Sequence, residues 1–250
     1  MARVKTGIPG FDELIEGGIP EGFNILITGS PGTGKTIFGI QYIFNGAADG
    51  ENGVYVSLDS TKTELLSQSK TLGMDLRNLE QAGKLVIVEV PLDTAGVNIF
   101  EIIEGAVQKV GAKRLVFDSL INFSINVDQF VIPLNYKMDP AVASVFGGKD
   151  NKNRIIYEGK SKERITYLLI NELSKLSTTN LVITAADQGG QRLTVDGVSE
   201  FVCDGAVVMK SLAVGDSLSR TIEIKKMRNT KIDGGIKSYD ISGSGLVLSK

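Results

Sequence analysis

The octapeptide at residues 29–36, Gly-Ser-Pro-Gly-Thr-Gly-Lys-Thr, narrows the possible folds of this chain more than any other stretch. It matches in full the phosphate-binding pattern of one glycine, any four residues and then Gly-Lys-Ser or Gly-Lys-Thr, known as a P-loop or Walker A motif. The short apolar run at 24–28 leads into it and predicts a buried parallel strand. Apolar residues at helical spacing over 36–48 predict a helix directly after it.

Each residue type in this loop suits the binding of a nucleoside triphosphate. Glycines let backbone N–H groups approach phosphate oxygens without a Cβ in the way. Lys35 would place a compact positive charge at the β- and γ-phosphates, and Thr36 would offer its hydroxyl to Mg²⁺. The helix that follows would point its positive end at the phosphates. With ATP and Mg²⁺ as predicted cofactors, the predicted nucleotide ligands are Gly29, Ser30, Pro31, Gly32, Thr33, Gly34, Lys35, Thr36 and Ile37.

Two carboxylates follow other predicted strands. Asp118 ends the apolar run Arg114–Asp118 and is the predicted Mg²⁺ partner of Thr36, because a P-loop site needs a strand-end carboxylate for the metal. Asp59 ends the run at 54–58 and is a candidate for orienting the water that attacks the γ-phosphate. A second interpretation stays open for Asp59, as the N-cap of the helix predicted after Ser60.

The order of predicted elements points to an α/β fold. Short apolar strands alternate with helices, which predicts a mostly parallel sheet covered by helices on both faces. After residue 205 the pattern changes to strands without helices between them, and this predicts antiparallel strands added at the edge of the sheet. Further strands are expected at 54–58, 85–90, 114–118, 181–185, 206–209, 221–225, 238–241 and 246–248, and helices at 12–15, 63–72, 99–110 and 164–176.

One stretch does not follow this order. Residues from about 122 to 160 carry mixed signals, and long irregular insertions are usually lids, binding segments or disordered loops. The sequence does not choose among these. We therefore expect a single domain over residues 1–250 that contains an insertion at about 122–160.

Composition removes several classes of function. The 250 residues include no histidine, which excludes histidine metal sites, a Ser-His-Asp triad and histidine general-base chemistry. The one cysteine, Cys203, excludes an internal disulfide and fits a reducing compartment. No apolar run approaches the roughly 20 residues that span a bilayer, so we expect a cytoplasmic protein that does not engage a membrane. The net charge of −2 gives no sign of strong attraction to nucleic acid.

Several motifs in a fixed order resemble a known family. Beside the P-loop, they are Ile-Pro-Gly-Phe-Asp-Glu-Leu at 8–14, Gly-Gly-Ile-Pro-Glu-Gly at 17–22, Leu-Asp-Ser-Thr at 58–61, Phe-Asp-Ser at 117–119 and Lys-Met-Arg-Asn-Thr at 226–230. In these the chain resembles the single-domain KaiC-like ATPases, a branch of the RecA/RadA superfamily common in archaea. The resemblance covers most of the chain but fails over 122–160. It implies a RecA-like sheet sandwiched by helices.

The resemblance also implies roles for two basic residues. Lys226 and Arg228 match the family's Lys-x-Arg motif, whose members reach across a subunit interface to the neighbour's γ-phosphate. It therefore implies a homo-oligomer, with a hexamer as the first expectation. From the residues alone, an exposed basic strand edge that deters aggregation remains an alternative. The predicted catalytic residues are Lys35, Asp59, Asp118, Lys226 and Arg228.

The chain departs from the family at informative positions. Asp59-Ser60 stands where relatives typically carry paired glutamates, and we expect slow hydrolysis because the carboxylate is a methylene shorter. Glu200 and Phe201 fall where autophosphorylating relatives carry Ser-Thr, so such autokinase activity is not expected. Gln188 is a candidate γ-phosphate sensor or a solvated turn residue. The clock protein of the family has two ATPase domains, whereas this chain has one.

Three functions remain as hypotheses. The first is a slow Mg²⁺-dependent ATPase that acts as an oligomer. The second is a regulatory module that binds ATP or ADP, contacts a protein partner and scarcely hydrolyses nucleotide. The third is a DNA-binding protein like the RadA paralogues, which is not favoured because a run of charges is more often a solvated face. Its basic run comprises Lys149, Lys152, Arg154, Lys160, Lys162 and Arg164.

Overall fold

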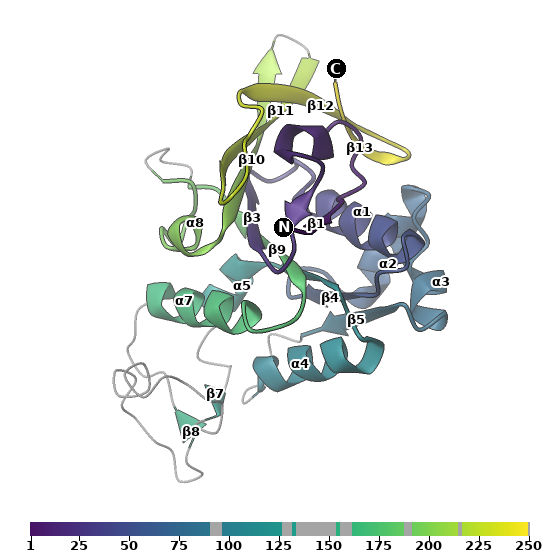
Figure 1. Cartoon of the computed structure of the whole chain (residues 1–250), viewed down its shortest axis with the longest axis vertical. Coiled ribbons are helices and arrows are strands. Elements are labelled where there is room, and N and C mark those ends of the chain that lie inside the picture. The colour runs from purple at the N-terminus through teal and green to yellow at the C-terminus, as the bar shows by residue number, and fades with distance from the viewer. Residues whose placement is uncertain are drawn as a thin grey trace.

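The computed structural model describes residues 1–90, 97–126, 132–133, 154–155, 162–187, 192–214 and 217–249. Within these residues the main feature is a nine-stranded sheet in the order β13-β12-β11-β10-β3-β9-β6-β4-β5. Its strands are β3 (Asn24–Gly29), β4 (Gly53–Ser57), β5 (Leu85–Glu89), β6 (Arg114–Asp118), β9 (Thr179–Ala185), β10 (Gly205–Val214), β11 (Ser217–Met227), β12 (Ile236–Ser242) and β13 (Gly245–Leu248). Figure 1 shows the sheet with its helices.

The sheet is parallel in its centre and antiparallel at one side. Strands β5, β4, β6, β9, β3 and β10 pair in parallel, and β11, β12 and β13 then extend the sheet with antiparallel pairs. Every residue of β3, β4 and β6 is buried, which explains why these strands read as continuous apolar runs. The predicted parallel sheet with C-terminal antiparallel strands is confirmed.

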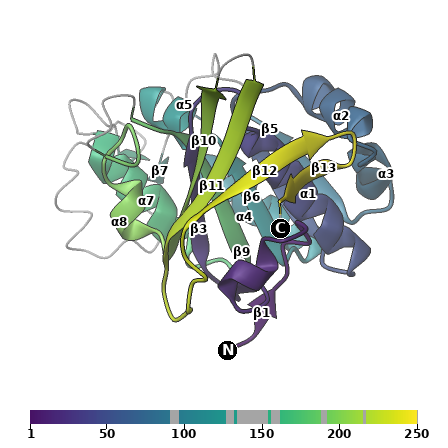
Figure 2. The ribbon, with the colours of Figure 1, turned by 90° about the horizontal axis from the view of Figure 1, so that it is seen from above.

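Helices cover both faces of the sheet. Alternate residues of β3 enter two separate apolar clusters, with Ile25 and Ile27 in one and Leu26 in the other. The first cluster includes side chains from α1 (Lys35–Ala48), α2 (Lys62–Thr71) and α3 (Leu76–Gln81), which lie together in Figure 2. The second includes side chains from α4 (Ile99–Val110), α5 (Leu120–Ile125) and α7 (Lys162–Leu173). The predicted layers of helix, sheet and helix are therefore present.

Local capping fixes the helix that follows β4. Thr61 caps α2, because its hydroxyl accepts a hydrogen bond from the Glu64 N–H while the Glu64 carboxylate accepts one from the Thr61 N–H. Asp59 therefore does not cap this helix, and the N-cap interpretation of Asp59 is wrong. The predicted helix began at residue 63, one position after the observed start.

The structure adds elements that the sequence pattern did not reveal. Helix α3 and helix α5 are only six residues each, too short to show a helical repeat of apolar residues. Helix α5 occupies the first part of the stretch predicted to be irregular from residue 122. It is ordered by its core contact, since the rings of Phe123 and Phe117 pack edge to face with centroids 5.9 Å apart.

Smaller elements complete the described chain. Strands β1 (Arg3–Val4) and β2 (Ile19–Pro20) pair beside the short helix η1 (Asp12–Ile15), which was predicted. Within the predicted insertion, β7 (Ile132–Pro133) pairs with β8 (Arg154–Ile155). Helix α8 (Ser199–Val202) precedes β10. Among the residues that the structure describes, no helix combines the length and apolar character needed to cross a bilayer.

Candidate functional site

The predicted phosphate loop lies at the centre of the sheet. Strand β3 ends at Gly29 and α1 begins at Lys35, so residues 30–34 turn above the carboxyl end of the sheet. Asp118 at the end of β6 and Asp59 just beyond β4 come to the same edge, because these strands run parallel to β3. A cavity of about 400 Å³ lies at this edge. It is lined by Gly32, Gly34, Lys35, Thr36, Ile37, Asp59, Gln68, Asp118, Arg220 and Ile241.

The backbone of the loop requires glycine at two positions. Gly34 has φ 89°, a left-handed conformation, and a Cβ there would lie 2.7 Å from Cδ1 of Ile241. A Cβ at Gly29 would lie 2.3 Å from the carbonyl oxygen of Met209 in β10. The loop is therefore held closely between β10 and β12, in a shape that only glycine permits.

Lys35 folds back over the loop. Its Nζ donates hydrogen bonds to the carbonyl oxygens of Gly29, at 2.9 Å, and Ser30, at 3.0 Å. An ammonium group has three N–H donors, so one remains for an anion in the loop. Burial lowers the pKa of Lys35, and the negative charges of Asp118 and Asp59 oppose that shift. The lysine is thus positioned at the loop with both carboxylates close by.

Thr36, which is partly buried, forms a hydrogen-bonded cluster with the buried side chains of Tyr55 and Asp118. The Thr36 hydroxyl donates to Oδ2 of Asp118 at 2.8 Å, and the Tyr55 hydroxyl donates to the same oxygen at 2.7 Å. Burial raises the pKa of Asp118 to about 6, against the lowering effect of the hydrogen bond from Tyr55. Burial also raises the pKa of Tyr55 well above its ordinary value, so this hydroxyl keeps its proton and acts as a donor.

The donors around Asp118 suit a hard cation. The Thr36 hydroxyl and the Asp118 carboxylate are in direct contact, and the Asp59 carboxylate lines the same cavity. Mg²⁺ prefers oxygen ligands and usually binds through one or two carboxylates together with substrate phosphates. The residues present therefore fit Mg²⁺ carried with the phosphates of a nucleotide.

Asp59 is fixed by residues of the neighbouring strand end. Its Oδ1 accepts a hydrogen bond of 2.9 Å from the Ser119 hydroxyl and a short one from the Asn122 amide. The Asn122 amide also donates to the carbonyl oxygen of Leu58 at 3.3 Å. This network links the ends of β4 and β6 and holds the Asp59 side chain in place. Sequence reasoning quoted Ser119 in a motif without giving it a role, and it missed Asn122 because that residue was assigned to the irregular stretch.

Lys226 and Arg228 lie at the opposite end of the sheet from the phosphate loop. Lys226 pairs with Ala206, and the Arg228 N–H donates to the carbonyl oxygen of Asp204, at the level of Asn24. Strand β3 runs from Asn24 to Gly29, so five strand steps, roughly 16 Å, separate that level from the loop. The structure does not bring these two residues together with Lys35, Asp59 and Asp118 of the same chain.

Both basic side chains are held by the segment around α8. The Lys226 ammonium donates to the carbonyl oxygens of Cys203, at 2.6 Å, and Phe201, at 3.2 Å. Burial lowers the pKa of Lys226, and the charge of Arg228 adds to that effect. Arg228 forms an ion pair of 2.9 Å with Asp204. The side chain of Phe201 is 68% exposed beside them, so this end of the sheet presents two fixed cations next to an apolar ring.

Arg220 is a site residue that the sequence did not indicate. It pairs with Ser211, beyond the pair of Met209 with Gly29, and so lies at the loop end of β11. Its Nε is buried and finds no hydrogen-bond partner among the described residues. A buried guanidinium donor without a partner, on the wall of the cavity, is suited to an anion. The predicted strand began at residue 221, and nothing local links Arg220 to the loop.

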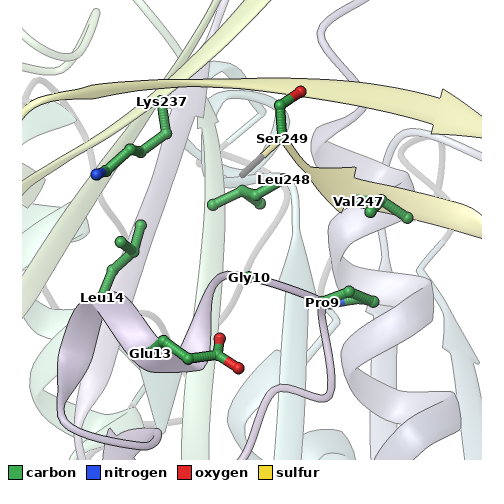
Figure 3. Close-up of a pocket in the computed structure, with 8 residues that line it drawn as sticks. All are labelled: Pro9, Gly10, Glu13, Leu14, Lys237, Val247, Leu248 and Ser249. Carbon is green, nitrogen blue, oxygen red and sulfur yellow. The ribbon is translucent and has the colours of Figure 1, made fainter.

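Other candidates fall outside the site or outside the described residues. Gln188 lies outside the described residues, as do the side chains of the basic run from Lys149 to Arg164. A second cavity, of about 510 Å³, lies between the N-terminal segment and the C-terminal strands (Figure 3). Its lining comprises Pro9, Gly10, Glu13, Leu14, Lys237, Val247, Leu248 and Ser249, none of which was predicted to bind nucleotide. The smaller cavity is the better candidate because it holds the charged cluster.

Comparison with known proteins relates this chain to a family of ATPases. A family model described as "ATPase: KaiC" matches residues 4–132 and 156–250. A UPF0273 protein of Thermotoga maritima is 30% identical, over 99% of this chain and 96% of that protein. The crystal structure of a KaiC-like protein from the hyperthermophilic archaeon Pyrococcus horikoshii OT3 is 31% identical and has a TM-score of 0.78, covering 100% of this chain and 99% of that one.

A longer relative matches as well. The circadian clock oscillator protein KaiC of Synechococcus elongatus is 29% identical over 98% of this chain. The match spans only 44% of that protein's length. The family model leaves residues 133–155 unmatched but covers 122–132 and 156–160, so the break in the resemblance is shorter than the predicted 122–160.

Proposed function

The chain belongs to the KaiC ATPase family, and from this premise we propose that it binds ATP with Mg²⁺ at residues 29–37 and hydrolyses it slowly as a homo-oligomer. One observation carries the proposal. Thr36, the last residue of the phosphate loop, contacts Asp118 at 2.8 Å, so the loop and the metal carboxylate already form one site. The domain comprises the whole of residues 1–250, with the insertion at about 122–160 as part of it.

Positive groups would surround the phosphates. Lys35 has a free N–H donor for the β- and γ-phosphates, and the N–H groups at the start of α1 point toward the same space. Arg220 adds a donor from the wall of the cavity. These groups act in a partly buried site, where charge-assisted hydrogen bonds are stronger than in water.

Thr36 and Asp118 would hold Mg²⁺. The Thr36 hydroxyl donates its hydrogen to Asp118, so its oxygen would remain available as a ligand for the cation. Asp118 would hold the cation together with Thr36, which is the role of strand-end carboxylates in P-loop sites. Bound Mg²⁺ supplies positive charge at the β- and γ-phosphate oxygens.

Asp59 is the proposed group for positioning the attacking water. Ser119 and Asn122 fix its carboxylate at the edge of the cavity. An aspartate reaches one methylene less far than the glutamates typical of the family. Because a small misplacement of a catalytic group costs a large factor in rate, we expect turnover to be slow.

The geometry of Lys226 and Arg228 supports an action on a neighbouring subunit. Along the sheet, Arg228 lies roughly 16 Å and Lys226 roughly 10 Å from the level of the loop of their own chain, and both are held there by the segment around α8. A second copy of the chain could receive them at its γ-phosphate, where cations stabilise the charge of the transferred group. A hexameric ring is the first assembly to test.

A regulatory module with little hydrolysis is the second candidate. The same network that fixes Asp59 favours it, since two hydrogen bonds to Oδ1 hold the carboxylate toward Ser119 and Asn122. In that case nucleotide binding would alter assembly or the contact with a protein partner. DNA binding is not favoured, because a run of charges is more often a solvated face than a nucleic-acid site.

The first experiment measures phosphate release with Mg·ATP over a range of protein concentrations, beside a Lys35→Ala control. Release that rises more steeply than protein concentration and disappears in the control supports an assembly-dependent ATPase. ATP binding without release would favour the regulatory module. Absence of ATP binding to the wild-type chain would contradict the proposed function.

A mixing experiment tests action between subunits. The Lys35→Ala variant lacks the cation of the phosphate loop but keeps Arg228. The Arg228→Ala variant keeps Lys35 but lacks the cation proposed to act on the neighbour. Each variant alone is expected to be inactive, and mixing them should restore part of the activity if Arg228 acts on a neighbour. Lys225→Ala is a matched control, because Lys225 pairs with Glu223 of its own strand. A mixture as inactive as its components would refute the trans role.

A further inference from the structure

Tyr55 is a buried tyrosine whose hydroxyl contacts the metal carboxylate. It lies in β4, where it pairs with Val116, two positions before Asp118 on the neighbouring strand β6. Because side chains alternate along a strand, Val116 and Asp118 face the same side of the sheet. The Tyr55 ring lies on that side too and its hydroxyl reaches Oδ2 of Asp118 at 2.7 Å. The side chain is fully buried.

Close packing confines this ring. Helix α1 passes over it at Gly39, where a Cβ would lie 3.4 Å from Cε2 of Tyr55 and 3.0 Å from Cγ1 of Val116. The helix can approach the sheet this closely because Gly39 has no side chain. The ring is therefore wedged between α1 and the sheet, and its hydroxyl is directed at the end of β6.

The hydroxyl shares its acceptor with the last residue of the phosphate loop. Both Tyr55 and Thr36 donate to Oδ2 of Asp118, one from the core and one from α1. Two donors on one oxygen fix the orientation of the carboxylate. Without the tyrosine hydroxyl, the contact with Thr36 alone would hold that oxygen. The partners behind a metal ligand set its orientation, and their loss typically costs 10–100-fold in metal affinity.

We propose that Tyr55 is a positioning residue for the Mg²⁺ site, which it serves by orienting Asp118. This inference rests on the proposed function, since it assigns Tyr55 to the metal of the same nucleotide site. The tyrosine is fully buried and is not among the residues that line the cavity, so it would act through Asp118. Its loss therefore weakens the Mg²⁺-dependent part of nucleotide binding and leaves binding without metal nearly unchanged.

A purely structural role for the hydroxyl makes a different prediction. A buried hydroxyl needs a hydrogen-bond partner, and its removal changes stability whatever that partner does. Tyr42 offers a matched comparison in α1. It is also fully buried, and its hydroxyl donates to the carbonyl oxygen of Thr179 at 3.0 Å, not to a site residue.

The test compares Tyr55→Phe and Tyr42→Phe with the wild-type chain. Binding of a non-hydrolysable ATP analogue is measured by calorimetry in EDTA and across a Mg²⁺ titration, together with thermal unfolding of the free proteins. We expect both variants to lose stability and to bind the analogue in EDTA within about twofold of wild type. Tyr55→Phe should need about 10-fold more Mg²⁺ for half of the metal-dependent gain, and Tyr42→Phe should match wild type.

Other results would overturn either the positioning role of Tyr55 or the proposed metal site. An unchanged Mg²⁺ requirement in Tyr55→Phe, or an equal shift in Tyr42→Phe, overturns the positioning role. Phenylalanine keeps the ring under α1, so a Tyr55→Phe chain without a cooperative unfolding transition would assign the hydroxyl to folding and overturn it too. A wild-type chain whose nucleotide binding ignores Mg²⁺ would refute the proposed metal site itself, which is a different pattern from a variant that behaves like wild type.

Discussion

The hydroxyl of Tyr239 in β12 donates a hydrogen bond of 2.5 Å to the carbonyl oxygen of Thr33 in the phosphate loop. Two residues further along the same strand, Ile241 lines the nucleotide cavity with Gly34, and its Cδ1 would lie 2.7 Å from a Cβ at that glycine. The antiparallel extension of the sheet thus reaches back over a loop that is formed some 200 residues earlier in the chain. Because the loop binds phosphates through its backbone, a strand that fixes the backbone also prepares the site.

Replacing Tyr239 by phenylalanine should weaken nucleotide binding. The ring keeps its packing, but the Thr33 carbonyl loses a buried donor, and a hydrogen bond of this kind contributes about 0.5–1.5 kcal/mol. We expect a loss of about 2–10-fold in affinity, measured by calorimetry with and without Mg²⁺. The loss should be equal in both conditions, unlike that of Tyr55→Phe. Unchanged affinity in a folded Tyr239→Phe chain would show that the loop needs no such support.

Substitutions at Asp59 should change turnover without changing binding. Asp59→Asn keeps an acceptor for the hydrogen bond from Ser119 but removes the charge that would orient or deprotonate water, so phosphate release should fall at least 10-fold. Asp59→Glu restores the reach of a glutamate and should raise release above wild type. The measurement is single-turnover hydrolysis at saturating Mg·ATP. Equal rates in all three proteins would remove Asp59 from the mechanism.

The buried carboxyl of Asp118 should make the stability of the free protein depend on pH. Burial raises its pKa from near 3.8 to about 6, so between these values the folded state holds a proton that the unfolded state has released. The unfolding free energy therefore falls as pH rises through this window, by on the order of 3 kcal/mol. Urea unfolding at about pH 4 and pH 7.5 measures it. Asp118→Asn should lack this component, and an identical pH profile in that variant would contradict the assignment.

Alanine substitutions at two helical glycines should change the free energy of unfolding in opposite directions. A Cβ at Gly46 in α1 would lie 2.2 Å from Nε of Arg114, which is 1% exposed and is held by Glu51 at 2.6 Å. Arg114 cannot withdraw, so Gly46→Ala should destabilise the chain by about 1–3 kcal/mol. Gly105 in α4 has open space around it, and Gly105→Ala should stabilise by about 0.5–1 kcal/mol. Chemical denaturation of both variants checks the pair, and a stable Gly46→Ala chain would show that Arg114 can move.

Local signals were sufficient for the regular elements of this fold. Helix α4 and strand β6 have the bounds that the sequence predicts. An amphipathic repeat and a buried apolar run are both patterns of residues that are close together in the sequence, so they can be recognised locally. The phosphate loop was predicted for the same reason, since its glycines, Lys35 and Thr36 are consecutive. Asp118 followed from its place at the end of a strand, which puts it at the edge where parallel strands present their carboxyl ends.

Short elements carried no such signal. Helix α5 has six residues and is ordered by the burial of Phe123 against Phe117, a contact between separate elements. Sequence reasoning placed its residues from 122 onward in an irregular insertion. It also left Asp59 as a possible helix cap, and only the capping bonds of Thr61 with Glu64 removed that alternative.

By itself, then, the sequence determined the parallel sheet, the loop and the residue types that suit a nucleotide with Mg²⁺. The tertiary structure alone decided which distant side chains support that site. Tyr55 reaches Asp118 from the next strand, Arg220 enters the cavity from β11, and Tyr239 holds the loop from β12. These contacts join residues far apart in the chain, and they arise from strand order, register and packing, which no local pattern encodes.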